Sequence, residues 1–308
     1  MSHATSVISN SRKSVLFGTS ALVCLALAAP VMADDFVITS SDGSTNGNIA
    51  PDDIDGSDTV TLGIALTTTG TNIGIRTTNV FNVDDGNTVT VTETGSITTG
   101  TGFFAHGIKN TGNDNTTTVS GSITTTGEAA YGIYNYGDDN ETTVSGSITT
   151  EENDSEGIRN MGSDNTTTVS GSIKTEGDNA YGVYSSTRKG NTRSENSIVV
   201  SGSIVTLGLN SYGIWNEGND NRTTVSDTGS IETVGKNAYG IYNLGDNNET
   251  TVSGSIVTST GVSTHGIHND GDDNETTISG SITTNGLKGR GIKNTGNDNT
   301  TTVSGSIT

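Results

Sequence analysis

The chain is short of cysteine, of basic side chains and of apolar residues. It has one cysteine in 308 residues, so no disulfide within the chain can hold the fold together. Its 14 lysines and arginines stand against 34 aspartates and glutamates, and the net charge of −20 makes nucleic acid and anionic lipid poor partners. Hydrophobic residues are 29% of the chain, a share at which composition alone suggests borderline disorder. These shortages exclude a disulfide-stapled domain and a nucleic-acid-binding protein.

A hydrophobic run long enough for a membrane span is also missing. The marked apolar stretch at 15–29 has 15 residues, whereas a membrane-spanning helix needs about 20. Arg12 and Lys13 precede this stretch, and the small-residue spacing at 31–33 is that of a signal-peptidase site. We therefore predict that residues 1–33 are a secretory signal peptide. Its removal would take away the only cysteine and leave an exported chain with a net charge of −22.

The sequence does contain a repeat of about 25 residues, which continues to the end of the chain. The segment at 116–123, TTTVSGSI, recurs with small changes at 141–148 and again at 300–307. Its Gly-Ser-Ile step recurs at intervals of 26, 25, 25, 31, 27, 25, 26 and 25 residues, starting at Gly95, Gly121, Gly146, Gly171, Gly202, Gly229, Gly254, Gly280 and Gly305. Such a period indicates stacked copies of one supersecondary unit, whose few fixed apolar positions form a continuous interior strip.

One repeat, at 103–127, reads as three short strands separated by corners. We expect strands at 104–110, 116–120 and 122–126, because β-branched residues are frequent there. The Gly, Asn and Asp residues at 111–115 predict a tight turn that visits positive φ. Three strands and three corners in about 25 residues are typical of one coil of a parallel β-helix. The prediction is an all-β fold, a right-handed parallel β-helix (solenoid) of about 25 residues per coil and about ten coils.

Alternation along the strands predicts which side chains face the interior. Thr117, Val119, Ile108 and Ile123 are expected inside, with the neighbours of Thr117 and Val119 outside. A polar column joins them, consisting of Asn110, Asn135, Asn160, Asn216, Asn243, Asn269 and Asn294, with Ser185 as the one departure. We expect these amides to hydrogen-bond from coil to coil as a buried ladder.

Three segments follow from this pattern. Residues 1–33 are the predicted signal peptide, and residues 34–57 match the repeat poorly and are expected to cap the first edge of the solenoid. The repeat domain is predicted at 58–308, ending within a repeat at Thr308.

Signal peptide, Gly/Thr/Ser/Asn-rich coils and missing cysteines together resemble the passenger region of bacterial autotransporters, over about residues 58–308. These are the pertactin-like and adhesin-like β-helices of Gram-negative surfaces. The resemblance implies a secreted protein or one displayed at the bacterial outer membrane. It also implies a C-terminal translocator barrel, which the sequence up to Thr308 does not contain, so contact with the outer membrane is expected only through that missing barrel. No catalytic or receptor motif comes with the resemblance, and the oligomeric state is left open.

Aromatic residues gather beside the recurrent Gly-Ile step. A column that accepts Tyr, Glu, His and Arg in different coils is expected on the outside. Exposed aromatic rows suit sugar rings or the core of a protein interface, whereas rings that stack only on each other are structural. Our candidate ligand-binding surface is the aromatic set on three successive coils, Tyr181, Tyr184, Tyr212, Trp215, Tyr239 and Tyr242.

Other columns suggest lesser alternatives. Stacked aspartates in the turns suggest calcium binding, although their spacing is not that of calcium β-rolls. Outward Thr-x-Thr pairs suggest an ice-binding solenoid, but charged residues such as Glu141 and Arg222 interrupt them. The longer corner at 185–197 brings Arg188, Lys189 and Arg193 together, either as a solvated loop or as a docking or processing site.

A glycan-active β-helix enzyme is the main alternative from another class. Such an enzyme needs long loops that gather acidic and basic groups over one face, and most corners here are short and alike. We therefore expect no enzyme, no catalytic residue, no metal and no cofactor. The predicted function is that of an adhesin-like structural solenoid that contacts a host-surface protein or glycan.

Overall fold

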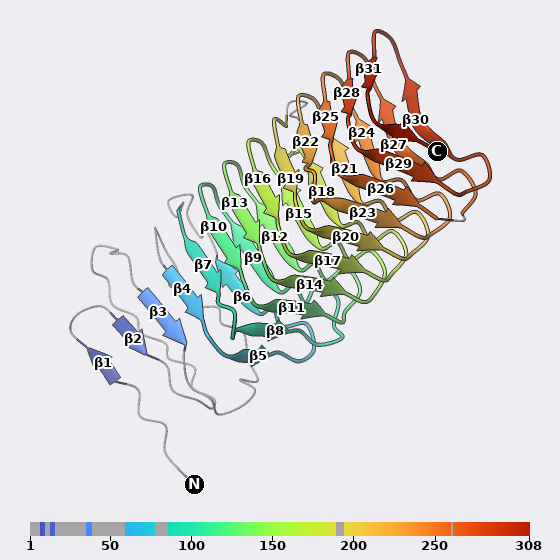
Figure 1. Ribbon diagram of the computed structural model, residues 1–308. Helices are drawn as coiled ribbons and strands as arrows, with labels where there is room; N and C mark the ends of the chain where they lie inside the picture. The colour runs from blue at the N-terminus through green and yellow to red at the C-terminus, as the bar shows by residue number, and fades with distance from the viewer. Residues whose placement is uncertain are drawn as a thin grey trace.

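The chain folds into one rod, in which successive turns of a parallel β-helix stack on one another. The computed structural model describes residues 59–77, 86–188, 194–259 and 261–308, together with the backbone of three short strands before them. Within these residues there is no helix, and the chain winds through about nine turns of about 26 residues each. Figure 1 shows the turns side by side along the rod, with the C-terminus at the far end from the first strands. The predicted all-β parallel β-helix is confirmed, with about nine turns where the repeat suggested about ten.

Three sheets run along the rod, and each turn contributes one strand to each sheet. The first sheet has thirteen strands in the order β1 (Val7–Ser9), β2 (Lys13–Val15), β3 (Asp35–Ile38), β4 (Thr59–Leu62), β7 (Thr88–Val91), β10 (Thr116–Val119), β13 (Glu141–Val144), β16 (Thr166–Val169), β19 (Ser197–Val200), β22 (Arg222–Val225), β25 (Glu249–Val252), β28 (Glu275–Ile278) and β31 (Thr300–Val303). The second sheet has ten strands: β5 (Ala65–Thr67), β8 (Ser96–Thr98), β11 (Ser122–Thr125), β14 (Ser147–Thr150), β17 (Ser172–Thr175), β20 (Ser203–Thr206), β23 (Ser230–Thr233), β26 (Ser255–Thr258), β29 (Ser281–Thr284) and β32 (Ser306–Ile307). The third has nine: β6 (Ile75–Thr77), β9 (Ile108–Thr111), β12 (Ile133–Tyr136), β15 (Ile158–Met161), β18 (Val183–Ser186), β21 (Ile214–Glu217), β24 (Ile241–Leu244), β27 (His265–Asp270) and β30 (Arg290–Thr295).

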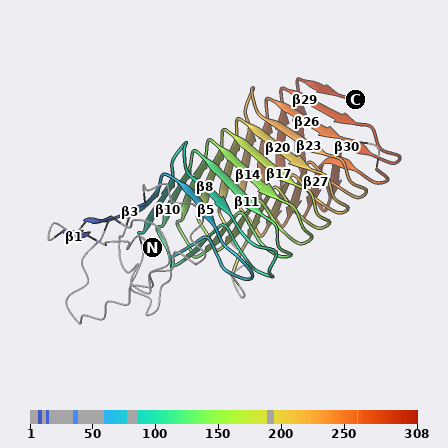
Figure 2. The ribbon, with the colours of Figure 1, turned by 90° about the horizontal axis from the view of Figure 1, so that it is seen from below.

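Each strand pairs in parallel with its equivalent in the next turn, except that β1 and β2 are antiparallel. Figure 2, seen from below, shows how regularly the second and third sheets repeat. β1 and β2 lie in the segment predicted as a signal peptide, and β3 lies in the predicted cap. The rest of residues 1–58, including the apolar stretch and the cleavage site, lies outside the described residues, so both assignments stay predictions.

The strands of the repeat at 103–127 agree with the prediction at two of three places. β10 and β11 match within one residue, whereas β9 begins at Ile108 and not at Phe104. Phe104 has a φ of 58°, a left-handed conformation that ends any extended strand. The residues before Ile108 therefore form a corner.

The core is a stack of aliphatic side chains, one from most strands and two from each of β4, β7 and β19. In one turn these are Val144, Ile148 and Ile158, each 1% exposed or less. Their equivalents along the rod form a single hydrophobic cluster, as the alternation of apolar and polar residues predicts. Since a turn adds only three or four such residues, the interior depends on what fills the rest of the space.

Buried asparagines fill much of it. The predicted ladder is present: Asn135 accepts a hydrogen bond from Asn110 at 2.7 Å and donates one to Asn160 at 2.8 Å. Asn135 also donates to Thr142 of the same turn at 3.0 Å, and most other members of the column repeat this pair of bonds. At Ser185 the ladder weakens, because the bond from Asn160 lengthens to 3.5 Å.

A second asparagine ladder lies at the corner between the third and first sheets. The backbone N–H and the side-chain amide of Asn140 both donate to Oδ1 of Asn165 at 3.0 Å. The residue before Asn140, Asp139, has a φ of 57°, so this corner is the predicted turn with positive φ. The ladder itself was not predicted, because Asn at this position was interpreted only as a turn former.

Glycine marks the places where successive turns come closest. A Cβ atom on Gly146 would lie 1.9 Å from the carbonyl oxygen of Gly121, and one on Gly132 would lie 2.5 Å from the carbonyl oxygen of Gly157. Both approaches are too close for any side chain, so the recurrent Gly-Ser-Ile and Gly-Ile steps are required by packing between turns.

Candidate functional site

The outer surface of the third sheet carries two columns of side chains, which we call the aromatic face. They lie before and after the recurrent Gly-Ile or Gly-Val step, and strand pairing aligns them from turn to turn. The first column consists of His106, Tyr131, Glu156, Tyr181, Tyr212, Tyr239, His265 and Arg290. The second consists of Lys109, Tyr134, Arg159, Tyr184, Trp215, Tyr242, His268 and Lys293.

Rings of the first column stack face to face along the rod. The ring centroids of Tyr212 and Tyr239 are 4.8 Å apart with an interplanar angle of 6°. The stack continues to Tyr181 on one side, at 5.2 Å and 24°, and to His265 on the other, at 5.0 Å and 17°. The sheet spacing of about 4.8 Å imposes this separation, because equivalent residues of paired strands lie directly above one another.

The second column packs against the first. Trp215 lies 4.8 Å from Tyr184 and 5.9 Å from Tyr242, and Tyr242 stacks on His268 at 5.0 Å and 25°. Between columns the contacts are edge-to-face, as between Tyr181 and Trp215 at 4.9 Å and 87°. Stacked and edge-to-face geometries are those that aromatic quadrupoles favour. The two columns therefore form one rigid layer over the sheet.

A charged pair interrupts the rings without opening the layer. The guanidinium of Arg159 lies 5.0 Å from the ring centre of Tyr131 and 4.8 Å from that of Tyr184. Its Nη1 also donates to the hydroxyl of Tyr131 at 3.0 Å and to Oε1 of Glu156 at 3.1 Å. A cation between two rings continues the stack through cation–π contacts. A similar cation, Lys109, lies 5.4 Å from the ring centre of Tyr134.

Glu156 is the unusual acid of this layer. It is 3% exposed, and its Oε2 has no hydrogen-bond partner within the described part of the chain. Burial raises its pKa to about 7, although the neighbouring Arg159 opposes the shift. The charge in the middle of the aromatic face therefore changes near neutral pH.

The three histidines of the aromatic face are neutral at that pH. Burial, helped by nearby Lys109, lowers the pKa of His106 to about 3. Burial and the neighbouring Lys293 lower the pKa values of His265 and His268 to about 4. Among the described residues, no group of three or more His, Cys, Asp or Glu side chains is placed to hold a metal ion.

Hydroxyl groups at the rim of the layer are bound to carboxylates of the next turn. Tyr184 donates to Glu217, and Tyr242 donates to Asp270 at 3.3 Å. Burial is the main cause that raises the pKa of both phenols well above the ordinary value, and the carboxylates raise it further. The phenols therefore stay protonated and serve as donors.

All six candidate residues predicted from the sequence lie together in this layer, on three successive turns. Their ring faces, however, are covered by one another, and Tyr184 is only 8% exposed. A sugar ring cannot enter between Tyr181, Tyr212 and Tyr239, whose centroids are 4.8 to 5.2 Å apart. Only ring edges remain for a partner, so both structural stacking and contact at the edges are compatible with the geometry. Ligand binding by the six stays a prediction.

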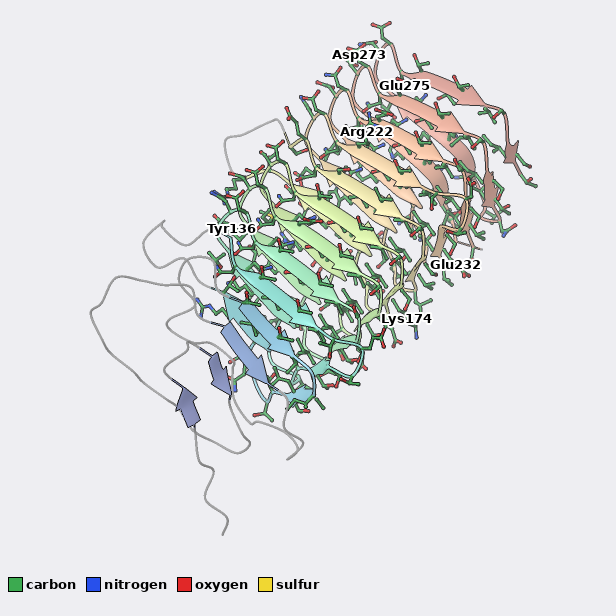
Figure 3. The ribbon with its side chains drawn as sticks, turned by 60° about the vertical axis from the view of Figure 1, so that its left-hand side comes forward. Tyr136, Lys174, Arg222, Glu232, Asp273 and Glu275 are labelled. Atoms are coloured by element: carbon green, nitrogen blue, oxygen red, sulfur yellow. The ribbon has the colours of Figure 1, made fainter. Side chains whose placement is uncertain are left out.

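The outward surface of the first sheet is a mixed one. Threonines such as Thr118 and Thr143 align, but the column beside them contains Glu141, Arg222 and other charged residues. Arg222 forms an ion pair with Glu249 at 2.5 Å, and Figure 3 shows the position of Arg222 on this surface. The charges interrupt the flat threonine array that an ice-binding surface would need.

Aspartates line the turns that carry the second asparagine ladder, as predicted; Asp273 is labelled in Figure 3. Partial burial and the carboxylates of Asp114 and Asp138 raise the pKa of Asp139 above its ordinary value. The repulsion expected between stacked carboxylates is therefore present.

Arg188, at the start of the longer corner, lies against side chains of earlier turns. The guanidinium of Arg188 lies 5.1 Å from the ring centre of Tyr136, 3.9 Å from Asp138, and 3.4 Å from Oδ1 of Asn113. Residues 189–193, with Lys189 and Arg193, lie outside the described residues. Of the three basic residues that were predicted to lie together, only Arg188 is described, and it contacts side chains of earlier turns.

Several asparagines of the turns begin Asn-x-Thr triplets, the sequence pattern for N-glycosylation, and three of them are buried. Asn115, Asn140 and Asn165 are each 1% exposed or less, because they belong to the second ladder. Their side-chain nitrogens are therefore out of reach of a glycosylating enzyme once the chain has folded.

Sequence reasoning missed the most exposed aromatic side chains. Phe103 is 55% exposed, Phe104 58% and Tyr136 42%. The signal was present in two adjacent phenylalanines at a corner where most other turns carry polar or small residues.

No helix in the described part of the chain has the length and apolar character needed to cross a membrane. Comparisons with protein-family models, with curated proteins and with solved structures find no match to this chain. The structure itself therefore establishes a parallel β-solenoid and no family.

Proposed function

We propose that this chain is an exported, non-catalytic rod, secreted or displayed at a bacterial outer membrane, that makes adhesive contacts through its aromatic face. The observation that carries the proposal is the continuity of that face: rings from Tyr181 and Tyr184 to His265 and His268 touch from turn to turn. Neighbouring rings already fix each side chain, so a partner would bind without further loss of side-chain entropy. Such pre-organisation supports recognition.

A protein is the partner that the ring geometry favours over a glycan. Sugars bind aromatic side chains mainly through the ring face, and here the faces are occupied by other rings or by Arg159. Edges, phenol oxygens and rim carboxylates such as Glu217 are what a partner would meet. This mixture of aromatic and polar groups is typical of protein interfaces. We therefore propose a host-surface protein as the partner.

Export and kinship are parts of the same proposal. The pattern at residues 1–33 supports secretion, and a thiol-free solenoid of about nine turns supports a relation in kind to autotransporter passengers. An adhesive rod needs length, repetition and a recognition face; the described turns supply the first two, and the aromatic face is the surface that we propose for the third.

The experiment measures binding of beads coated with the purified chain to cultured epithelial cells. In the test variant, Tyr181, Tyr184, Tyr212, Trp215, Tyr239 and Tyr242 are all changed to serine. We expect binding to fall to the level of uncoated beads, and protease treatment of the cells to abolish wild-type binding while glycosidase treatment leaves it unchanged. Equal binding by variant and wild type would remove the proposal.

Two controls separate recognition from folding. The first changes six outward threonines of the first sheet to serine (Thr118, Thr143, Thr168, Thr224, Thr251 and Thr277) and should leave binding unchanged. The second changes the five tyrosines of the set to phenylalanine. Because the rings remain stacked, this variant should melt like the wild type and lose only the binding that depends on hydroxyl groups.

A further inference from the structure

Two adjacent phenylalanines stand out from the surface of the rod. Phe103 and Phe104 lie in the corner between β8 and β9, in the row of loops beyond the ends of β8, β11 and β14 in Figure 1. They are 55% and 58% exposed, with ring centroids 6.2 Å apart. Large apolar side chains exposed next to one another mark interaction surfaces in soluble proteins.

Folding does not explain Phe104. The corner requires a left-handed backbone, and Phe104 adopts it with a φ of 58°. The equivalent corners of the described turns have Ala129, Asp154, Asn179, Asn210, Asn237, Ser263 or Lys288 in this conformation, and none of these is an aromatic residue. Asparagine and aspartate accept it far better than a bulky aromatic residue does. A strained and exposed ring at this one corner therefore points to a surface role.

The pair is one end of an aromatic band that crosses the rod. Phe104 lies 6.3 Å from His106, His106 lies 5.3 Å from Tyr134, and Tyr134 lies 6.2 Å from Tyr136. Tyr136 is 42% exposed, so both ends of the band reach solvent. The rings thus touch in a line across the rod, with exposed Phe104 and Tyr136 at its ends and buried His106 between them. Lys109 and Arg188 lie over the rings of Tyr134 and Tyr136.

Charges of opposite sign flank this band. Towards the N-terminus lie Arg76 and Lys109, paired in register on β6 and β9. Towards the C-terminus the next corner carries exposed Glu128, whose carbonyl oxygen accepts a hydrogen bond from the Phe104 N–H at 3.2 Å. The corner after that carries Glu151, Glu152 and Asp154, all exposed. The corners on the flank towards the C-terminus are therefore acidic, whereas Arg76 and Lys109 make the other flank basic. Arg159 and Arg188, on the third-sheet side of the acidic flank, are already paired with Glu156 and Asp138.

We infer that this band is the interface with a second copy of the chain, placed antiparallel across a two-fold axis near Phe103 and Phe104. Such an axis brings Arg76 and Lys109 of one copy towards the acidic corners of the other, and apolar rings against apolar rings. A parallel arrangement would place the acidic corners of both copies together. Since the chain carries a net charge of −20, this local complementarity is what permits two copies to associate in one orientation. The inference uses a part of the aromatic face that contains none of the six residues of the adhesion test, so the two proposals can fail separately.

The test is sedimentation velocity of the full-length chain over a range of concentrations. The wild type should sediment as a dimer, and a variant with Phe103→Ser and Phe104→Asn should sediment as a monomer, its dissociation constant raised at least about thirtyfold, as expected for loss of a hot spot. Asn suits the left-handed corner, so the variant should melt no lower than the wild type.

The matched control is Leu287→Ser, at the corresponding corner of a later turn, where Leu287 is 74% exposed. This variant should remain a dimer. A wild type that is monomeric at every concentration, or a dimer that persists when both phenylalanines are replaced, would overturn the inference.

Charge exchange tests the orientation. Arg76→Glu and Glu128→Arg should each weaken the dimer, and the two together should restore it, because each residue faces the other across the axis. Additive weakening in the double variant would overturn the antiparallel arrangement.

Discussion

Single polar residues hold the interior of this rod as firmly as the aliphatic ones do. Each turn buries only three or four core aliphatics, and asparagines occupy much of the remaining space with hydrogen bonds to the turns before and after. A buried amide left without partners costs about 1–3 kcal/mol. The ladders therefore exclude most other residues from their positions, which is why asparagine recurs so regularly.

What the sequence predicted at this scale depended on the alternation of strands. Asn110 and its equivalents were predicted inside because Ile108 and Thr117 fixed the faces of β9 and β10. Asn140 and its equivalents were missed because alternation stops at a corner, where only the backbone dihedrals decide where a side chain points. The burial of His106 and Glu156 could not be predicted from alternation either, because the side chains that cover them belong to neighbouring turns and not to their own strand.

Acid should weaken the fold through the histidines of the aromatic face. The folded pKa values of His265 and His268 are about 4, below the ordinary 6.5, so the unfolded chain binds more protons between these limits. Stability is then fully present above pH 6.5 and falls as the pH drops towards 4. Glu156, with a folded pKa of about 7 against 4.5, acts in the opposite sense, because its contribution falls as the pH rises from 4.5 to 7. Three histidines outweigh this one acid.

The measurement is the melting temperature between pH 7.5 and 4, in the wild type and in a variant with His265→Phe and His268→Phe. Phenylalanine keeps the stacked rings and removes the two titrations, so the melting temperature of the variant should fall less on acidification. Surface carboxylates titrate equally in both proteins. Parallel curves would show that these two histidines do not couple to folding.

At the scale of strands and sheets, ring stacking in the aromatic face and amide hydrogen bonds in the two asparagine ladders connect each turn to the next. The three sheets were predicted from the repeat because each period contains three strand-forming segments, and the residue register followed from the constant spacing. The covered ring faces could not be predicted, since the orientation of each ring depends on the ring in the next turn, as for Tyr212 on Tyr239. The alignment of the rings in columns could be predicted from the sequence, whereas their orientations depend on contacts between neighbouring strands.

The weak point of the first ladder lies between β15 and β21. Ser185 is too short to bridge: its hydroxyl is 3.5 Å from the amide of Asn160, and Oδ1 of Asn216 has no partner in the described part of the chain. We expect Ser185→Asn to accept from Asn160 and donate to Asn216, raising the free energy of unfolding by about 1 kcal/mol.

Chemical denaturation measures this effect. The control is Ser172→Asn, an exposed position in the preceding turn, which should change stability by less than about 0.5 kcal/mol. A destabilised Ser185→Asn variant would show that the interior at β18 has no room for the longer side chain.

At the scale of the whole molecule, turns contact only their neighbours, so the rod should tolerate the loss of one turn. Deleting residues 141–165 removes 25 residues and joins Asn140 to Thr166 in the same register. The Glu156–Arg159 pair leaves with them, and Tyr131 and Tyr134 then meet Tyr181 and Tyr184 directly. We expect a folded solenoid one turn shorter, because stability in such arrays is approximately a sum of turns and interfaces.

Circular dichroism and thermal melting test the deletion. A deletion of residues 141–153, which removes about half a turn, is the control; it brings outward residues into the core and should not fold. Failure of the full-turn deletion to fold would show that the interrupted stack at Glu156 and Arg159 is needed for the rod.

Because the turns are nearly identical, a strand could pair with the wrong turn during folding. The sequence of β10, Thr-Thr-Thr-Val, is the same as that of β16, so β10 could pair with β16 as well as with β13 and leave a whole turn looped out. Loop closure opposes such a skip only weakly, since its cost grows slowly with length. The residues that break the repeat then distinguish one turn from another: Arg159 lies between Tyr131 and Tyr184, and Arg188 lies over Tyr136. In a chain built from one repeated motif, the residues that depart from the motif distinguish the turns and favour pairing in the correct order.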